Sequence, residues 1–138
     1  MQLEFAIMCD AAEVNSSGLI YILKGGYDIT VASEFPVIIH QVILVVRILC
    51  NPEEVNHQHI LISQIIDPHG RILPSKITVP FTTPVYPGHP DRPNKYTLKL
   101  EHRSVSFDEP GDYTFRFLVD GLQLGQAGLE VKRKEGKE

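Results

Sequence analysis

The stretch FDEPGDYTFRF, residues 107–117, joins a tight turn to the start of a strict alternation of apolar and polar residues. Pro110 presets φ for a turn, and Gly111 tolerates positive φ. Tyr113, Phe115 and Phe117 then share one side of an extended strand, because side chains alternate between the two faces with a period of two. The stretch therefore predicts a corner between strands, with the two phenylalanines in a core.

The residues that follow predict a hairpin and a second irregularity. Asp120-Gly121 is a strong two-residue hairpin signal, and Leu122 begins the returning strand. The apolar register of that strand shifts around Gly125 and Gly128, which predicts a β-bulge. Tyr113 stands where immunoglobulin-like domains place the Tyr of a tyrosine corner, whose hydroxyl bonds to backbone a few residues upstream.

Period-two patterning continues through the rest of the chain, and helical periodicity is nearly absent. In the first strand Leu3, Phe5, Ile7 and Cys9 are expected on one face. The stretch DAAEVNSSG, residues 10–18, contains turn formers, and GLIYIL after it is apolar on both faces. Residues 42–50 form the most hydrophobic segment and predict a central strand. We expect an all-β fold, an antiparallel immunoglobulin-like β-sandwich of seven to nine strands, with a closed barrel as the alternative.

Length and charge bound the classes of function. The chain has 138 residues, 43% of them hydrophobic and 22% charged, with a net charge of −4. We expect one domain over residues 1–132 and a charged tail over 133–138. The scattered Lys and Arg residues argue against nucleic-acid binding. No segment approaches the roughly 20 apolar residues of a membrane helix, and the N-terminal residues lack the pattern of a secretory signal.

The two cysteines, Cys9 and Cys50, provide no disulfide framework and favour a reducing cytoplasm. Each ends an apolar run, so we expect a buried, small apolar side chain, with a Cys9–Cys50 bridge as the alternative.

The chemistry-bearing side chains predict no catalytic residue and no cofactor. No nucleophile motif or phosphate-binding glycine loop is present. His57 and His59, two apart on a strand, are weak candidates for metal ligands that lack a third ligand in sequence. Arg47 is the charged residue inside the central apolar run, and we expect an acid to pair with it, for which the sequence offers Asp10, Glu13 or Asp28.

The apolar residues predict an interaction surface. If the strands over 42–50 and 57–66 pair, Ile43, Val45, Leu61 and Ile65 form a second apolar face that needs a cover. The Pro-rich loop over residues 82–94 is one candidate cover, and a partner protein or a second subunit is the other. The leading hypothesis is a non-enzymatic protein-interaction module that forms a homodimer through this face.

A small-ligand or carbohydrate-binding domain is the alternative. It would use the loop over residues 82–94, with Tyr27, Tyr86, Asp28 and Arg47 as ligand-binding residues.

Several features resemble a family of small bacterial all-β proteins that is known as a domain of unknown function. They are the Leu3-x-Phe5 start, CDAAEVNSSGLIYILKGGYD, the Phe35-Pro36 pair, Arg47 in its strand, and EPGDYTFRFLVDG. The resemblance spans nearly the whole chain. It implies a bacterial or phage-related cytoplasmic protein with an all-β fold, and it transfers no mechanism. The C-terminal half also resembles generic immunoglobulin-like sandwich domains.

Overall fold

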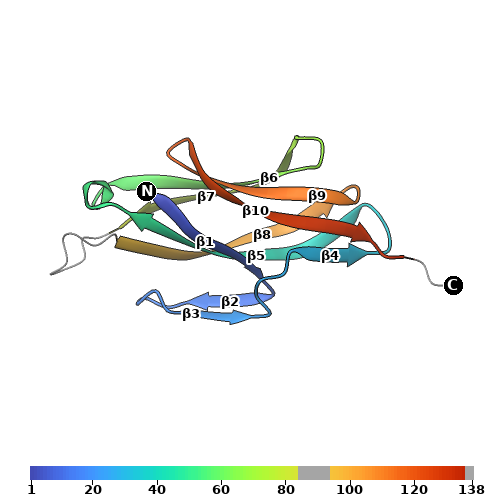
Figure 1. The fold of residues 1–138 in the computed structure, drawn as a ribbon, viewed down its shortest axis with the longest axis horizontal. Helices are drawn as coiled ribbons and strands as arrows, with labels where there is room; N and C mark the ends of the chain where they lie inside the picture. The colour runs from blue at the N-terminus through green and yellow to red at the C-terminus, as the bar shows by residue number, and fades with distance from the viewer. Residues whose placement is uncertain (84–93, 136–138) are drawn as a thin grey trace.

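The computed structural model describes residues 1–83 and 94–135, and within them the chain forms ten strands and one short 3-10 helix (Figure 1). The elements in order are β1 (Gln2–Cys9), β2 (Ala11–Val14), β3 (Ile20–Leu23), β4 (Ile29–Ala32), β5 (Val37–Cys50), η1 (Pro52–Glu54), β6 (Gln58–Ile66), β7 (Ile72–Thr82), β8 (Asn94–Phe107), β9 (Gly111–Val119) and β10 (Leu122–Arg133). Residues 136–138 of the predicted tail lie outside the described residues.

The strands form three sheets, with the orders β1-β5-β8, β4-β10-β9-β6-β7 and β2-β3. The all-β class is confirmed. β4 pairs with β10 in parallel, whereas the other pairs are antiparallel, so the five-stranded sheet is mixed. The described strands outnumber the seven to nine expected. One reason is that residues 11–14, expected in a turn, form β2, where Ala12 and Val14 have an apolar surface to cover.

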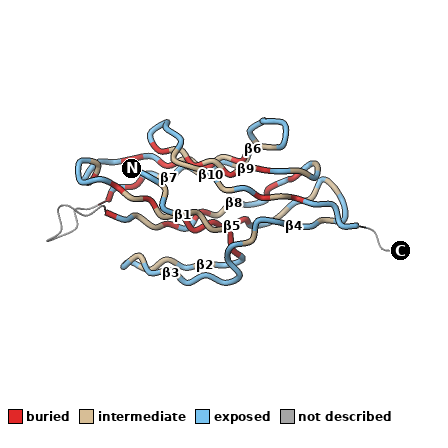
Figure 2. The backbone as a smooth tube through the Cα atoms, viewed as in Figure 1, coloured by how far each residue is buried: buried red, intermediate tan, exposed pale blue. Residues whose placement is uncertain are grey.

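The main core lies between the three-stranded and the five-stranded sheet (Figure 2). Burying each large apolar side chain here stabilises the fold by about 1.5–3 kcal/mol relative to leaving it exposed. Fully buried members from both sheets include Leu44 and Ile48 of β5, Leu100 of β8, Leu61 and Ile65 of β6, and Phe115 and Phe117 of β9. The aromatic alternation that follows Pro110-Gly111 therefore enters the core as predicted.

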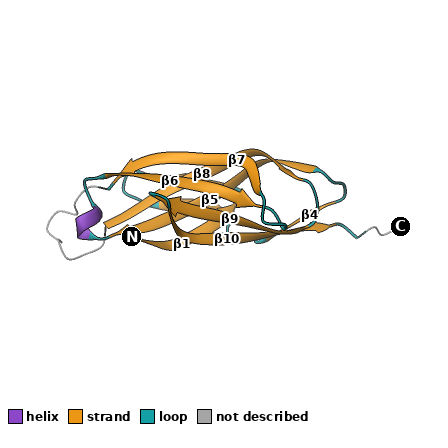
Figure 3. Ribbon diagram, turned by 90° about the horizontal axis from the view of Figure 1, so that it is seen from above, coloured by secondary structure: helices purple, strands orange, loops and turns teal. Residues whose placement is uncertain are grey.

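The two large sheets approach each other along both edges. Viewed from above, β1 runs close to β10 on one side and β7 lies close to β8 on the other (Figure 3). Gly125 of β10 lies where a Cβ would come within 2.6 Å of the Leu3 side chain of β1. The predicted bulge in β10 is present, since its pairing with β9 shifts between Gln123 and Gly125.

β1 packs apolar side chains on both faces of its sheet, so the prediction that its apolar residues share one face is wrong. A register shift against β5 lies between Leu3 and Phe5. Beyond the shift, Met8 packs in the main core, while Phe5 and Cys9 pack on the opposite side of the sheet. A bulge of this kind reverses the faces, which the alternation in the sequence does not reveal.

The corner at Tyr113 is confirmed. Its hydroxyl donates a hydrogen bond to the Glu109 carbonyl over 2.7 Å, and the ring is buried against Phe107. The hairpin that follows turns at Asp120 and Gly121, with φ values of 51° and 83°, as expected for a two-residue turn between twisted strands.

Candidate functional site

The four residues predicted as one partner surface lie on two different sheets. β5 pairs with β1 and β8, whereas β6 pairs with β7 and β9. Leu61 and Ile65 are fully buried in the main core, and Ile43 and Val45 are buried on the far side of β5. The predicted pairing of these strands is wrong. Alternation shows which residues share a face of one strand, but it does not identify the neighbouring strand.

The chain itself covers Ile43 and Val45. With Cys9 they form a second core, on the face of the three-stranded sheet opposite the main core. The hairpin of β2 and β3 lies over it as a third layer (Figure 1) and contributes Val14 and Ile20. The cover is thus the β2–β3 hairpin. The sequence had suggested the Pro-rich loop, or a partner protein or second subunit.

The other side of β3 is apolar and faces solvent. Leu19, Tyr21 and Leu23, which we call the hairpin outer face, are 61%, 63% and 61% exposed. A shallow depression of about 320 Å³ lies beside them, lined by Ala11, Ala12, Glu13, Tyr21, Ile22 and Leu23. The signal was present in the sequence as GLIYIL, which is apolar on both faces, but the sequence does not show which face remains uncovered.

β3 also has a free edge. Within the described residues its single hydrogen-bonded neighbour is β2. Alternate backbone N–H and C=O groups of a strand point to opposite sides, so half of those in β3 point away from the hairpin. The hairpin therefore presents both an apolar face and an unpaired strand edge.

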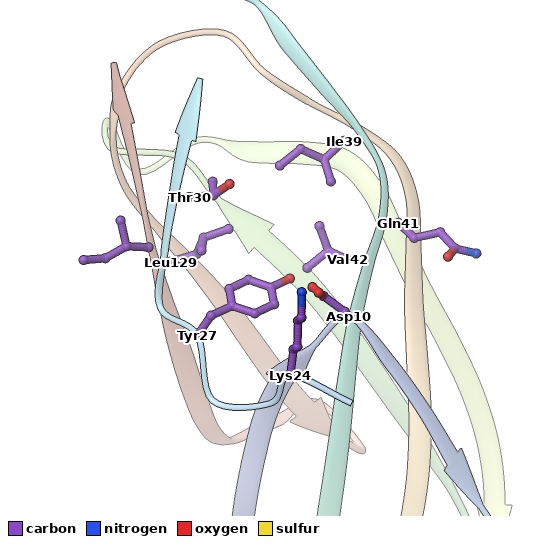
Figure 4. Close-up of a pocket in the computed structure, with 9 residues that line it drawn as sticks. Asp10, Lys24, Tyr27, Thr30, Ile39, Gln41, Val42 and Leu129 are labelled. Atoms are coloured by element: carbon purple, nitrogen blue, oxygen red, sulfur yellow. The ribbon is translucent and has the colours of Figure 1, made fainter. Parts of the chain in front are cut away.

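A cleft of about 350 Å³ opens at one end of the molecule, between β4 and β5 (Figure 4). It is lined by Asp10, Lys24, Tyr27, Ile29, Thr30, Ile39, Gln41, Val42 and Leu129. Val42 and Leu129 belong to the buried core, so the cleft reaches the edge of the apolar interior.

Three polar groups from two segments of the chain converge in this cleft, one after β1 and two from the loop between β3 and β4. Asp10 directly follows β1, Lys24 directly follows β3, and Tyr27 precedes β4. Their carboxylate, ammonium and hydroxyl groups point toward one another (Figure 4). Burial, followed by the charge of Asp10 and the Cys9 thiol, raises the pKa of the Tyr27 hydroxyl, so this group remains a hydrogen-bond donor.

The residues predicted to bind a ligand are dispersed. Tyr27 lines the cleft, but Asp28 is exposed outside the lining, and its carbonyl accepts a hydrogen bond from the Glu130 N–H. Tyr86 lies outside the described residues, as does most of the predicted loop, of which 82, 83 and 94 are described.

Arg47 anchors the hairpin and does not pair with an acid. Its Nε donates to the Thr97 hydroxyl over 2.7 Å, and its Nη2 donates to the Gly18 carbonyl over 3.0 Å. The guanidinium also lies over the Phe5 ring, 5.2 Å from the centroid. Residues 1–83 and 94–135 give it no ion pair, so the expected partners are wrong. A carbonyl and a hydroxyl satisfy the half-buried guanidinium instead.

The two histidines proposed as weak metal ligands lie in different environments. His57 is exposed and precedes β6, whereas the His59 side chain is largely buried. His59 Nδ1 contacts the Asp120 carboxylate at 2.7 Å, and Nε2 contacts the Glu54 carbonyl at 2.7 Å. Both ring nitrogens of His59 are therefore already engaged. The described part of the chain contains no group of three or more metal-ligating side chains, and none of its helices is long and apolar enough to cross a membrane.

A buried polar network was missed by the sequence analysis. His102 of β8 is fully buried and lies 2.8 Å from the hydroxyls of Ser63 in β6 and Ser75 in β7. Burial lowers the pKa of His102 to about 4. The network links the two large sheets, because His102 belongs to the three-stranded sheet and both serines belong to the five-stranded sheet. The polar residues lie far apart in sequence and only the fold brings them together.

Comparison with known proteins identifies a family and no activity. No curated protein matches the chain. One solved structure that is similar is Pseudomonas fluorescens alkylpurine DNA glycosylase AlkC bound to DNA containing an abasic site analog, with 13% sequence identity and a TM-score of 0.44. That match covers 76% of this chain and 28% of the glycosylase. The model of a family of unknown function, DUF6941, matches residues 4–132. Since that match spans nearly the whole sequence, the chain belongs to the DUF6941 family.

Proposed function

We propose that the protein is a non-enzymatic protein-interaction module that self-associates through the hairpin outer face and the free edge of β3. The observation that carries the proposal is the exposure of Leu19, Tyr21 and Leu23 on a hairpin that forms its own two-stranded sheet. Contiguous exposed apolar residues mark interaction surfaces, and an apolar edge strand pairs readily with another strand.

A second copy of the chain fits this surface. Two β3 edges pair antiparallel about a two-fold axis, so each copy presents the same surface to the other. The pairing joins two hairpins into a four-stranded sheet and places Tyr21 and Leu23 of one copy beside those of the other copy on the same face. A two-stranded hairpin is only marginally stable alone, and added strands stabilise it.

The chemistry-bearing groups support a non-enzymatic reading. The imidazole of His102 is buried and hydrogen-bonded to Ser63 and Ser75, and His59 is engaged on both nitrogens. The proposal includes no catalytic residue, cofactor, nucleic acid or membrane partner.

The cellular setting is part of the same proposal. We place the protein in a reducing cytoplasm, because Cys9 and Cys50 are free and buried in separate cores. The bacterial origin rests on the sequence resemblance alone. We further propose that the two large sheets form an immunoglobulin-like sandwich, which the Tyr113 corner supports.

Sedimentation velocity over a concentration series tests self-association. We expect the wild-type protein to dimerise and Tyr21→Asp to weaken dimerisation by about a hundredfold, because each dimer carries the charge twice at an apolar contact. Leu122→Glu is the matched control, since Leu122 is 73% exposed at the start of β10. A wild-type protein that remains monomeric, or equal loss of dimer in both variants, contradicts the proposal.

A further inference from the structure

The cleft between β4 and β5 exists because β1 pairs with only part of β5. β1 pairs with β5 from Leu49 to Ile43 and then leaves the sheet. The earlier part of β5, residues 37–42, pairs with β8 on one side only within the described chain. The space that β1 would have filled is open toward β4 and forms the cleft.

The two ends of the cleft differ in chemistry. Ile39, Val42 and Leu129 line it with aliphatic surface, and the last two are almost fully buried. At the other end Asp10, Lys24 and Tyr27 point toward one another (Figure 4). Its volume of about 350 Å³ lies at the lower end of the range of ligand sites, about 300–1,000 Å³.

The backbone of Lys24 has a conformation that is unfavourable for residues other than glycine. Its φ is +51°, in the left-handed region where glycine is preferred. Strain of this kind persists where the surrounding structure requires it, and it clusters at binding sites. Here it places an ammonium group at the cleft.

The polar end carries one negative charge, on Asp10, and one positive charge, on Lys24, and these two groups do not form an ion pair. Within residues 1–83 and 94–135, neither Asp10 nor Lys24 has an ion-pair partner. A simple anion would be repelled by Asp10, and a simple cation would be repelled by Lys24. A molecule that carries both charges satisfies both groups.

We propose that the cleft binds a small zwitterion with an aliphatic body, of the class of the aliphatic α-amino acids. The ammonium group of the ligand contacts Asp10, and its carboxylate contacts Lys24 and the Tyr27 hydroxyl. Its aliphatic body packs against Ile29 and Ile39, over the buried Val42 and Leu129. This site is made by other residues than the proposed self-association surface, although Lys24 directly follows Leu23 of that surface.

The site also connects to the hairpin. Asp10 precedes β2 and Lys24 follows β3, so the two charged groups flank the two ends of the hairpin. A ligand that contacts both groups holds the two ends together, and local opening of the hairpin then requires loss of the ligand.

Calorimetric titration with three probes tests the ligand class on the wild-type protein. L-leucine carries both charges, N-acetyl-L-leucine lacks the ammonium group, and L-leucinamide lacks the carboxylate. We expect L-leucine to bind and each capped analogue to bind about tenfold to a hundredfold more weakly, the loss expected for one charged hydrogen bond. No binding of L-leucine at millimolar concentration, or equal binding of all three, overturns the proposal.

Two variants test the assigned residues. Lys24→Gly relieves the left-handed backbone, so we expect a higher melting temperature together with weakened L-leucine binding. Lys76→Ala is the control, since Lys76 is exposed on β7, and should bind L-leucine as the wild type does. Hydrogen exchange gives a further readout, because L-leucine should slow exchange of the hairpin amides in the wild type and in Lys76→Ala, but not in Lys24→Gly. Undiminished binding by Lys24→Gly overturns the assignment.

Discussion

His102 shows how a single residue couples the two large sheets. It belongs to β8 in the three-stranded sheet, and its ring contacts Ser63 and Ser75 in the five-stranded sheet. The ring also packs edge-on against Phe115. A buried polar group stabilises a fold only when it has hydrogen-bond partners, and here both nitrogens have one. The network therefore selects one alignment of the sheets.

The buried imidazole predicts a loss of stability in mild acid. Its pKa in the folded protein is about 4, against an ordinary value of 6.5, so between these values the unfolded chain binds a proton that the folded protein does not. The free energy of unfolding should then fall as the pH falls from 6.5 to 4, by up to about 1.4 kcal/mol per pH unit from this group.

Urea unfolding across this pH range, compared between wild type and His102→Gln, measures the contribution of His102. Both proteins share every other titrating group. The difference between the pH dependences of their free energies of unfolding therefore isolates the contribution of His102. Parallel pH profiles would show that the imidazole is protonated in the folded state as readily as in the unfolded chain.

At the scale of elements, the β2–β3 hairpin is the least embedded part of the fold. Each of its strands has four residues, and it rests on a second core of only Cys9, Ile43 and Val45. The side chain of Arg47 holds its turn at Gly18. Elements with few buried contacts open locally at a lower free energy than the core does.

Hydrogen exchange should show this difference directly. Ile20→Ala removes apolar contact with the second core, and we expect it to lower the free energy of hairpin opening by about 1–2 kcal/mol. The amides of β2 and β3 should exchange faster in this variant, while those of β6 and β9 should remain unchanged. Ile72→Ala is the control, because Ile72 is 55% exposed on β7 and lies outside the hairpin. Equal acceleration in the two variants would show that the second core does not hold the hairpin.

At the scale of the whole molecule, one contact joins segments far apart in the chain. The Asp120 carboxylate, in the turn between β9 and β10, contacts His59 and accepts a hydrogen bond from the Ile60 N–H over 3.0 Å. Hydrogen bonds with Asp120 and with the Glu54 carbonyl raise the pKa of His59. The folded state therefore binds the His59 proton more tightly than the unfolded chain does, whereas it binds the His102 proton less tightly.

Asp120→Asn should cost more stability in mild acid than in mild base. The His59 contribution is fully present below its ordinary pKa of 6.5 and is lost as the pH rises through the raised value. Because Asp120 is half exposed, we expect a difference of about 0.5–1 kcal/mol between the two conditions. Asparagine keeps the acceptor for Ile60, so the difference reports on charge.

Unfolding curves on either side of neutrality provide this measurement. Asp112→Asn, at an exposed position of β9, is the matched control. A cost for Asp120→Asn that is the same at both pH values would exclude a charged pair with His59.

The candidate sites were only partly predictable. Tyr27 was predicted as a ligand-binding residue and does line the cleft, but Asp10 and Lys24 were not. The stretch GLIYIL is apolar on both faces, which is the signal for an exposed apolar side. The predicted partner surface was instead placed on Ile43 and Val45, which are buried. The cleft is made by segments that meet only after the sheets assemble, and that assembly also decides which face of the hairpin stays exposed.

The sequence by itself determined the strands and the turns between β8, β9 and β10. Pro110-Gly111, Tyr113 and Asp120-Gly121 act through local φ preferences and side-chain alternation, which need no distant partner. Only the tertiary structure decided which strands are neighbours, and therefore that a hairpin covers Ile43 and Val45 and that a cleft opens beside β4. The physical reason is that alternation defines the two faces of a strand, whereas burial across the whole molecule selects what lies against each face.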